Sequence, residues 1–186
     1  VVSGGKLSAM PEEKISGGEL ETLALPANCL TGIVTYVNQP AGAGNAPYHI
    51  RQRNMATGAD VLVLASAFPI QSTASEASGN YIVFTMDDAL ATGYNLYLIN
   101  QTAGTVQRLT NWVGDELNAS ITQMAPNATI TWDAPNAAGF RKVHYRKYNG
   151  LPALGAPVLY QRRIQNALAV NDSQSSVDDD GGFIGF

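Results

Sequence analysis

The sequence predicts an all-β protein built from a repeated unit of four short strands. Only 14% of the residues are charged, against roughly 25% in ordinary soluble domains. The chain also contains 18 glycines and 9 prolines, a composition that favours strands and tight turns over exposed helices. Apolar residues follow the helical period for no longer than about two turns. A turn residue followed by a β-branched and aromatic strand, by contrast, recurs along the chain.

The recurring strand defines the period of the repeat. Its copies contain four equivalent isoleucines, which lie 49, 48 and 54 positions apart, at Ile33, Ile82, Ile130 and Ile184. One further strand is expected before the last three copies, over 71–77, 119–125 and 173–179. Two more strands are expected after each copy, except after the last.

The first of these two following strands ends in asparagine in every copy, as suits the start of a turn. Its copies span 48–54, 94–100 and 142–149. The second begins at a glycine-containing turn, over 58–64 and 103–109, and residues 17–23 match the same position. In the third unit it is assigned to either 151–154 or 157–160. Four short strands in roughly 45–50 residues are typical of a β-propeller blade.

The chain ends are expected to complete one blade together. We predict a single domain over 1–186 with repeat units at 25–69, 70–117 and 118–172, and a last unit in which 173–186 pairs with 1–24. In that unit the N-terminal part supplies two outer strands, near 6–10 and 19–23. Closing the ring in this way gives four blades and protects the sheet edges. The alternatives are a fragment of a larger propeller and a jelly-roll coat domain.

The segment Ser78–Trp112 resembles a repeat of the TolB-like β-propeller family. Two of the family's motifs occur in order, as Leu96-Tyr97-Leu98-Ile99-Asn100 and Arg108-Leu109-Thr110-Asn111. The resemblance extends to 30–76 and more weakly to 127–160. The family's Pro-Asp-Gly turn is replaced by sequences such as Ser78-Gly79. The resemblance implies a propeller fold, and it carries over no functional residue.

The usual signatures of catalysis are missing from the sequence. It contains no Gly-x-Ser-x-Gly motif and no metal-binding histidine pair. The single cysteine, Cys29, lies among apolar residues, and neither His49 nor His144 belongs to a motif. We therefore expect a protein that is not an enzyme and has no cofactor and no bound metal.

Charge and hydropathy limit the classes of partner. The formal net charge of −4 argues against nucleic acid, and no stretch approaches the ~18 apolar residues of a membrane span. The basic residues of 141–147 are interpreted as solvated side chains on edge strands. We therefore expect a protein partner or self-assembly, with no nucleic acid and no membrane insertion.

Five residues are candidates for a binding site. Trp112 follows the repeat's Leu-Thr and is expected to be an exposed contact, with Asp115 beside it and Tyr94 as a further aromatic residue. Asp87 and Asp88 offer carboxylates that could bind calcium, although turn chemistry is the preferred explanation for them.

Four Asn-x-Ser/Thr sequons permit glycosylation, at Asn100, Asn118, Asn127 and Asn171. Together these features predict a non-catalytic protein-interaction or structural module, a subunit of a larger extracellular or periplasmic assembly. The alternative is a glycan-binding or substrate-binding propeller attached to a hydrolase. That alternative requires Trp112 and the Asp87-Asp88 loop to converge on one concave pocket.

Overall fold

The computed structural model describes β-strands and the connections between them, and no helix occurs in the described residues. These residues are 20–24, 32–39, 47–76, 78–89, 93–122, 128–148, 158–159, 176–177 and 184–185. The strands are β1 (Leu20–Ala24), β2 (Ile33–Gln39), β3 (Tyr48–Asn54), β4 (Asp60–Ser66), β5 (Ile70–Ser75), β6 (Tyr81–Met86), β7 (Asn95–Asn100), β8 (Thr105–Arg108), β9 (Leu117–Ile121), β10 (Ala128–Pro135), β11 (Arg141–Tyr148), β12 (Val158–Leu159), β13 (Ser176–Val177) and β14 (Ile184–Gly185).

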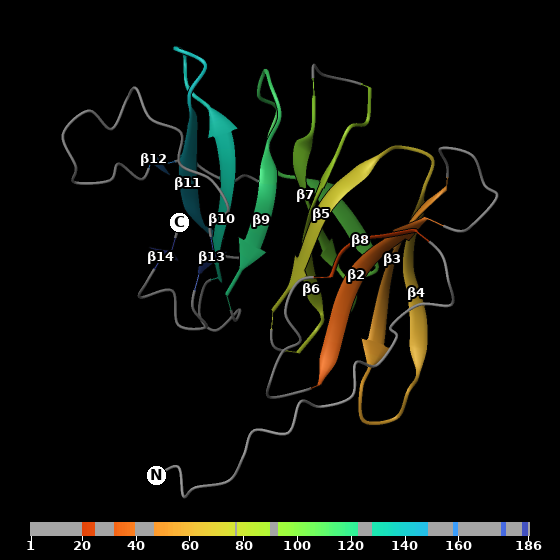
Figure 1. Cartoon of the computed structure of the whole chain (residues 1–186). Coiled ribbons are helices and arrows are strands. Elements are labelled where there is room, and N and C mark those ends of the chain that lie inside the picture. The colour runs from red at the N-terminus through yellow and green to blue at the C-terminus, as the bar shows by residue number, and fades with distance from the viewer. Residues whose placement is uncertain are drawn as a thin grey trace, which may run out of the picture.

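The strands form three four-stranded antiparallel sheets in chain order. The first sheet is β1-β2-β3-β4, the second is β5-β6-β7-β8 and the third is β9-β10-β11-β12; β13 and β14 pair separately. Each strand of a sheet therefore pairs with the next strand along the chain, as expected for a meander. The three sheets stand side by side with the second in the middle (Figure 1).

Most of the predicted strands are confirmed. β3 has the predicted bounds, β7 lies within the expected 94–100, and β11 lies within one residue of the expected 142–149. The fourth strand of the third unit is β12, which selects 157–160 over 151–154. β13 and β14 fall inside the two C-terminal strands expected within 173–186. The expected strand at 6–10 lies outside the described residues.

The predicted place of the strand near 19–23 is wrong. This strand is β1, and it pairs with β2 in the first sheet, with Leu20 opposite Gln39. The glycine-led pattern of 17–23 suited the last strand of a unit. Pairing with the next strand in sequence instead makes β1 the first strand of its own unit. The first sheet thus begins before residue 25, and residues 20–24 do not belong to the predicted last unit.

Charged side chains on β11 also differ from the prediction. β11 lies between β10 and β12, so it is not an edge strand. Lys142 is only 1% exposed and Arg146 is also buried, whereas Lys147 is exposed. Alternation explains the difference, because successive side chains of a strand point to opposite faces. Lys142 and Arg146 share the face of Ala134 and Ile130, which pack against the second sheet.

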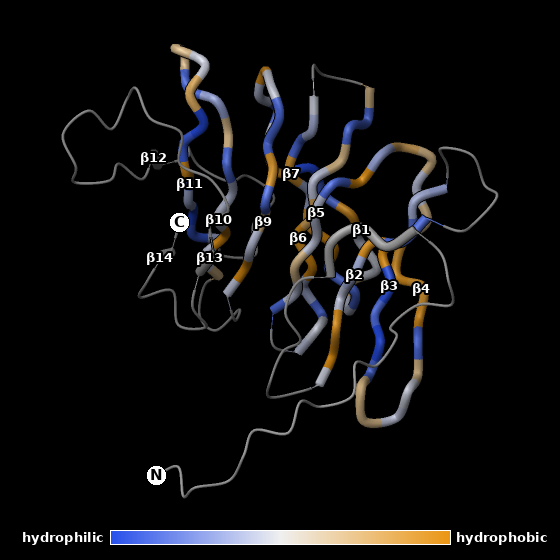
Figure 2. The backbone as a smooth tube through the Cα atoms, viewed as in Figure 1, coloured by the Kyte–Doolittle hydropathy of each residue, from blue (hydrophilic) through white to orange (hydrophobic). Residues whose placement is uncertain are grey.

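Two hydrophobic clusters fill the spaces between neighbouring sheets. Ile82 and Phe84 of β6 pack with Val37 and Ile50 of the first sheet. Val83, which points to the opposite face of β6, packs instead with residues of the third sheet. The second sheet is therefore buried on both faces, and hydrophobic stretches run along β2 and β6 in Figure 2. The large aromatic side chains of Phe84, Tyr97 and Trp132 belong to these clusters between the sheets.

Polar contacts also join adjacent sheets. The Thr35 hydroxyl donates to the Ser75 hydroxyl at 2.8 Å, and the Ala119 amide donates to the Ser72 hydroxyl at 3.3 Å. The Gly79 carbonyl accepts a hydrogen bond from the side-chain amide of Gln52 at 2.9 Å, and the side-chain amide of Gln101 donates to the side-chain oxygen of Gln52 at 2.9 Å. These bonds fix how the sheets are stacked in addition to the nondirectional apolar contacts.

The strand ends of the three sheets define two ends of the molecule. All of the predicted binding residues lie at the same end. We call the upper end the end at which β2, β4, β6 and β10 finish and β3, β5, β7, β9 and β11 begin. Pairing brings these points together, since Tyr48 lies opposite Ser66, Met86 opposite Asn95 and Pro135 opposite Arg141. In Figure 1 the β8–β9 and β10–β11 connections are drawn at the top, and the link from β4 to β5 lies at the upper right.

Candidate interaction surface at the upper end

Hydrogen bonds join the described parts of three connections at the upper end. The Asp87 amide donates to the Pro69 carbonyl at 3.0 Å, which joins the β6–β7 loop to the β4–β5 loop. The Glu116 amide donates to the Tyr94 carbonyl at 2.8 Å, which joins the β6–β7 loop to the β8–β9 loop. Three connections far apart in the sequence are thereby held against one another.

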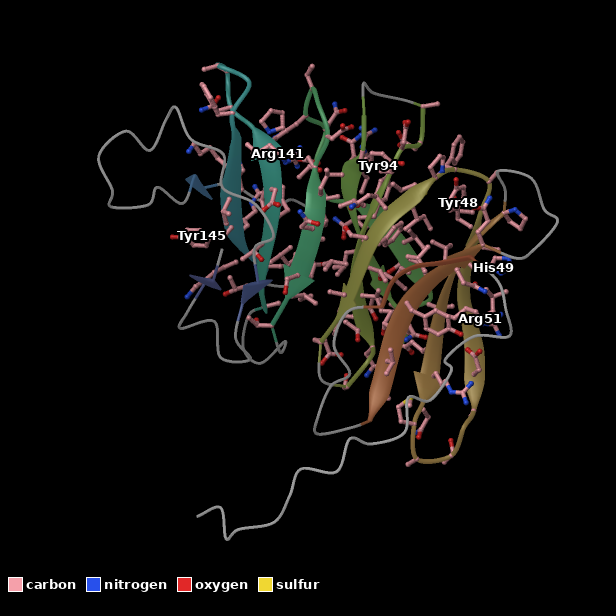
Figure 3. All side chains as sticks on the ribbon, viewed as in Figure 1. Tyr48, His49, Arg51, Tyr94, Arg141 and Tyr145 are labelled. Atoms are coloured by element: carbon pink, nitrogen blue, oxygen red, sulfur yellow. The ribbon has the colours of Figure 1, made fainter. Side chains whose placement is uncertain are left out.

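Tyr94 and Asp115, both predicted site residues, meet at this surface. The Asp115 side chain accepts a hydrogen bond from the Tyr94 amide at 3.2 Å. Tyr94 is half-buried and Asp115 is exposed. Burial raises the pKa of the Tyr94 hydroxyl, with further contributions from Tyr48 and from the charges of Asp87 and Asp115. Figure 3 shows Tyr48, Tyr94 and Arg141 in the upper part of the molecule.

The close approach of two glycines makes this meeting possible. Gly93 has a φ of +106° and Gly114 a φ of +100°, both unfavourable for other residues. A Cβ atom at Gly93 would lie 2.5 Å from the Asp115 Oδ1 atom and 3.0 Å from the carbonyl carbon of Gly114. Only a residue without a side chain therefore fits between the two loops.

The two neighbouring aspartates have different environments. Asp87 is half-buried, and its Oδ1 atom accepts a hydrogen bond from the Ala89 amide at 3.2 Å, which is the predicted turn chemistry. Asp88 is buried, accepts a hydrogen bond from the Tyr97 hydroxyl and lies 3.4 Å from an Arg108 nitrogen. Asp88 therefore holds strands together, and Asp87 is the member of the pair that faces the surface.

Trp112 is not the exposed contact that the sequence predicts. Its ring packs edge-on against Trp132 and His144, with centroids 5.8 and 4.8 Å away, and it packs against the core between the second and third sheets. The loop after β8 folds back so that this large ring covers the end of that core. Trp112 thus anchors the loop, and the neighbouring Val113 points outward.

Exposed apolar side chains are the part of the surface that the sequence did not reveal. Val113 is 84% exposed and Phe68 is 42% exposed, and each lies in the connection between two neighbouring sheets. The sequence did offer one clue. Phe68 and Val113 each follow the last strand of a sheet, β4 and β8, so they occupy equivalent positions of the repeat. Large exposed apolar residues on otherwise polar loops are candidate contacts for a partner.

Glu116 secures the β8–β9 loop from within. Its side chain is fully buried, and one carboxylate oxygen accepts hydrogen bonds from the Leu96 amide, at 3.1 Å, and from the Thr110 hydroxyl. The other oxygen makes no hydrogen bond among the described residues. Burial raises the pKa of Glu116 to about 7, although hydrogen bonds from Thr110 and Leu96 and the charge of Arg108 partly oppose this rise.

His144 lies in the same core, stacked against Trp132 at 5.7 Å. Within the described residues neither ring nitrogen forms a hydrogen bond. Burial lowers the pKa of His144 to about 4, and the nearby Ala134 backbone and Asp133 charge offset only part of this effect. A neutral, packed imidazole of this kind contributes to the core.

Two of the four sequons fall in the described residues. The Asn100 side chain accepts a hydrogen bond from the Ala103 amide at 3.0 Å in the turn after β7. The Asn118 side-chain amide donates to Asp133 at 2.6 Å, so a glycan on its nitrogen would leave one N–H for this bond. Asn127 and Asn171 lie outside the described residues.

In the part of the chain that the structure describes, no three His, Cys, Asp or Glu side chains gather closely enough to hold a metal ion. Over the same residues, the structure has no long apolar helix that could cross a membrane.

The three sheets match part of a β-propeller. The crystal structure of TolB from Acinetobacter baumannii superposes with a TM-score of 0.57 at 13% identity, over 82% of this chain and 34% of TolB. A prolyl endopeptidase, from a study of inter-domain dynamics in catalysis and specificity, gives 0.53 at 12%, over 89% of this chain and 25% of its own. The sequence matches no protein-family model and no curated protein. The likeness therefore shows the fold.

Replacing Gly93 with alanine is expected to lower the free energy of unfolding by about 3 kcal/mol, because backbone strain and an overpacked contact add together. The new methyl group would press on Asp115 and the Gly114 backbone. Urea denaturation followed by tryptophan fluorescence measures the change.

Gly104→Ala provides the matched control. Gly104 also has a positive φ, +63°, but nothing lies within 4 Å of the place that a Cβ atom would take there. It should cost only about 1 kcal/mol for the left-handed backbone. Equal losses in the two variants would show that the loops do not touch as described.

Proposed function

We propose that the chain is a non-catalytic interaction module that binds a protein partner through its upper end. The exposure of Val113 carries this proposal, because the side chain faces outward while the ring of Trp112 beside it is packed against Trp132. A rigidly displayed apolar residue loses little conformational freedom on binding. Phe68 and Tyr94 extend the apolar surface to the neighbouring loops.

The ionisable groups enclosed beneath the loops support a structural role for this region. Glu116 and His144 are both buried in the core beneath the loops, and Asp88 is bonded to Tyr97 and Arg108. Catalytic groups must reach a reacting atom, whereas these side chains are enclosed by protein.

The glycan-binding alternative loses its main support. It needed the Trp112 ring as an open platform, and that ring is packed against Trp132 and His144. A protein partner, which binds through apolar side chains with a polar rim, suits the exposed Val113 and Phe68 better.

The proposal also includes closure of the sheets into a propeller and the location of the protein. β13 lies against β9 and β10, where a fourth sheet would stand, which supports a four-bladed propeller. A place in a larger extracellular or periplasmic assembly rests on the sequons.

The interaction is tested by site-specific photocrosslinking. A benzoyl-phenylalanine at position 113 is expected to give discrete adducts in extracts of the source organism, and the same probe at position 105, in β8 at the opposite end of the second sheet, is not. Adducts of equal yield from both positions, or none from position 113, would contradict the proposal. Val113→Asp should abolish adducts from a probe at position 68.

A further inference from the structure

The accessible charge of the upper end is negative. Burial raises the pKa of the Tyr94 hydroxyl, and the charges of Asp87 and Asp115 add to this rise, so both carboxylates lie near Tyr94. Each carboxylate accepts one backbone hydrogen bond, from Ala89 and from Tyr94 respectively. Among the described residues neither carboxylate takes part in an ion pair. Their charge is therefore available to a partner.

The cations near this surface are already engaged. Arg108 contacts Asp88 and donates to the Thr110 carbonyl at 2.8 Å. Arg141 donates to the backbone carbonyls of Asp115 and Asp133, at 3.1 and 2.8 Å. Lys142 is buried, and His49, on β3, lies one residue beyond Tyr48. The partner thus meets two carboxylates that form no ion pair among the described residues, with the Arg141 guanidinium hydrogen-bonded to the backbone carbonyl of Asp115.

Aromatic and apolar groups adjoin these carboxylates. Tyr94 follows Gly93, which touches the Gly114 backbone next to Val113. On the other side Asp87 bonds to Pro69, next to Phe68. An aromatic ring near two carboxylates attracts a cation both through its face and through the charges.

We infer that the upper end binds a basic segment of a protein partner, in which a lysine or arginine side chain lies against Tyr94 between Asp87 and Asp115 and a neighbouring apolar residue contacts Val113 or Phe68. This inference rests on the proposed function and adds the chemistry of the partner. Charge complementarity selects the basic segment, because an acidic one would bring like charges together at Asp87 and Asp115.

The test is a titration of the ¹⁵N-labelled chain with the peptide acetyl-Arg-Leu-Arg-amide. The amide resonances of Gly93, Val113 and Asp115 are expected to shift, with saturation. Acetyl-citrulline-Leu-citrulline-amide has the same shape without the charge and is expected to cause no shift. The double variant Asp87→Asn, Asp115→Asn should weaken binding at least tenfold. Both asparagines keep the acceptor oxygen for Ala89 and Tyr94, so the loops should remain folded.

Asp60→Asn is the matched control. Asp60 lies at the other end of the first sheet, where it pairs with Arg51 at 3.1 Å, and its replacement removes one negative charge, whereas the double variant removes two. Binding should be unchanged in this variant. Equal shifts with both peptides, or equal weakening by Asp60→Asn, would overturn the basic-segment inference and leave the interaction function intact. The absence of a shift with either peptide would also overturn the inference. In that case the photocrosslinks at position 113 still test the interaction function independently.

Discussion

Replacing Trp132 with alanine is expected to lower the free energy of unfolding by about 3–5 kcal/mol, the usual cost of truncating a buried tryptophan. Trp132 is 0% exposed, and its ring lies between the second and third sheets, stacked on His144 and against the edge of Trp112. Its removal leaves a cavity at the point where the two sheets meet. Urea denaturation at pH 7 measures the loss.

The same cavity should loosen the loop above it. Trp112 loses one of its two aromatic partners, so amide hydrogen exchange at Val113 is expected to quicken. Val113→Ala serves as the control, because its exposed side chain should change stability by no more than about 0.5 kcal/mol. A Trp132→Ala loss as small as that of Val113→Ala would mean that the sheets do not pack through this ring.

The second large effect is a pH-dependent stabilisation by Glu116→Gln. The pKa of Glu116 is about 7 in the folded chain, above the ordinary value of 4.5. Its contribution to stability is therefore complete below pH 4.5 and is lost as the pH rises to 7. This loss amounts to about 3 kcal/mol. Glutamine resembles the protonated acid at every pH, so the variant should equal the parent at pH 4.5 and exceed it in stability at pH 8.

His144 has the opposite pH dependence. Its pKa falls from 6.5 to about 4 on folding, so its contribution is complete above pH 6.5 and is lost as the pH falls toward 4. In the parent chain the two slopes oppose one another between pH 4.5 and 6.5. His144→Phe keeps an aromatic ring and removes the titration, which should expose the Glu116 slope. Denaturation of the three proteins across pH 4–8 measures these curves, and parallel curves would contradict both pKa shifts.

Much of the fold could be predicted because the repeat is local. Ile33, Ile82 and Ile130 occupy β2, β6 and β10, the second strands of the three sheets. Antiparallel strands that follow one another in sequence leave a clear pattern of turns and alternating residues. β1 was misplaced because a glycine-led, leucine-ending run suits the first and the last strand of a unit equally well.

The candidate site was predicted less completely, because it depends on which loops meet. Tyr94, Asp87 and Asp115 were identified, and the structure brings them together. Nothing in the local sequence reveals that Trp112 turns inward while Val113 points outward, since that depends on the core formed by β10 and β11. The burial of Lys142 has the same origin, because it depends on how the third sheet stands against the second.

The pairing of every sheet strand with its neighbour along the chain has a consequence for how such a protein can change over evolutionary time. Each sheet is encoded by one uninterrupted stretch, and the first two are joined by the short link 67–69. A duplication or deletion that begins and ends in such links adds or removes a whole sheet without breaking a hydrogen-bonded ladder. The number of sheets can thus change by gene duplication or deletion, whereas such a change inside a sheet would break its strand pairing.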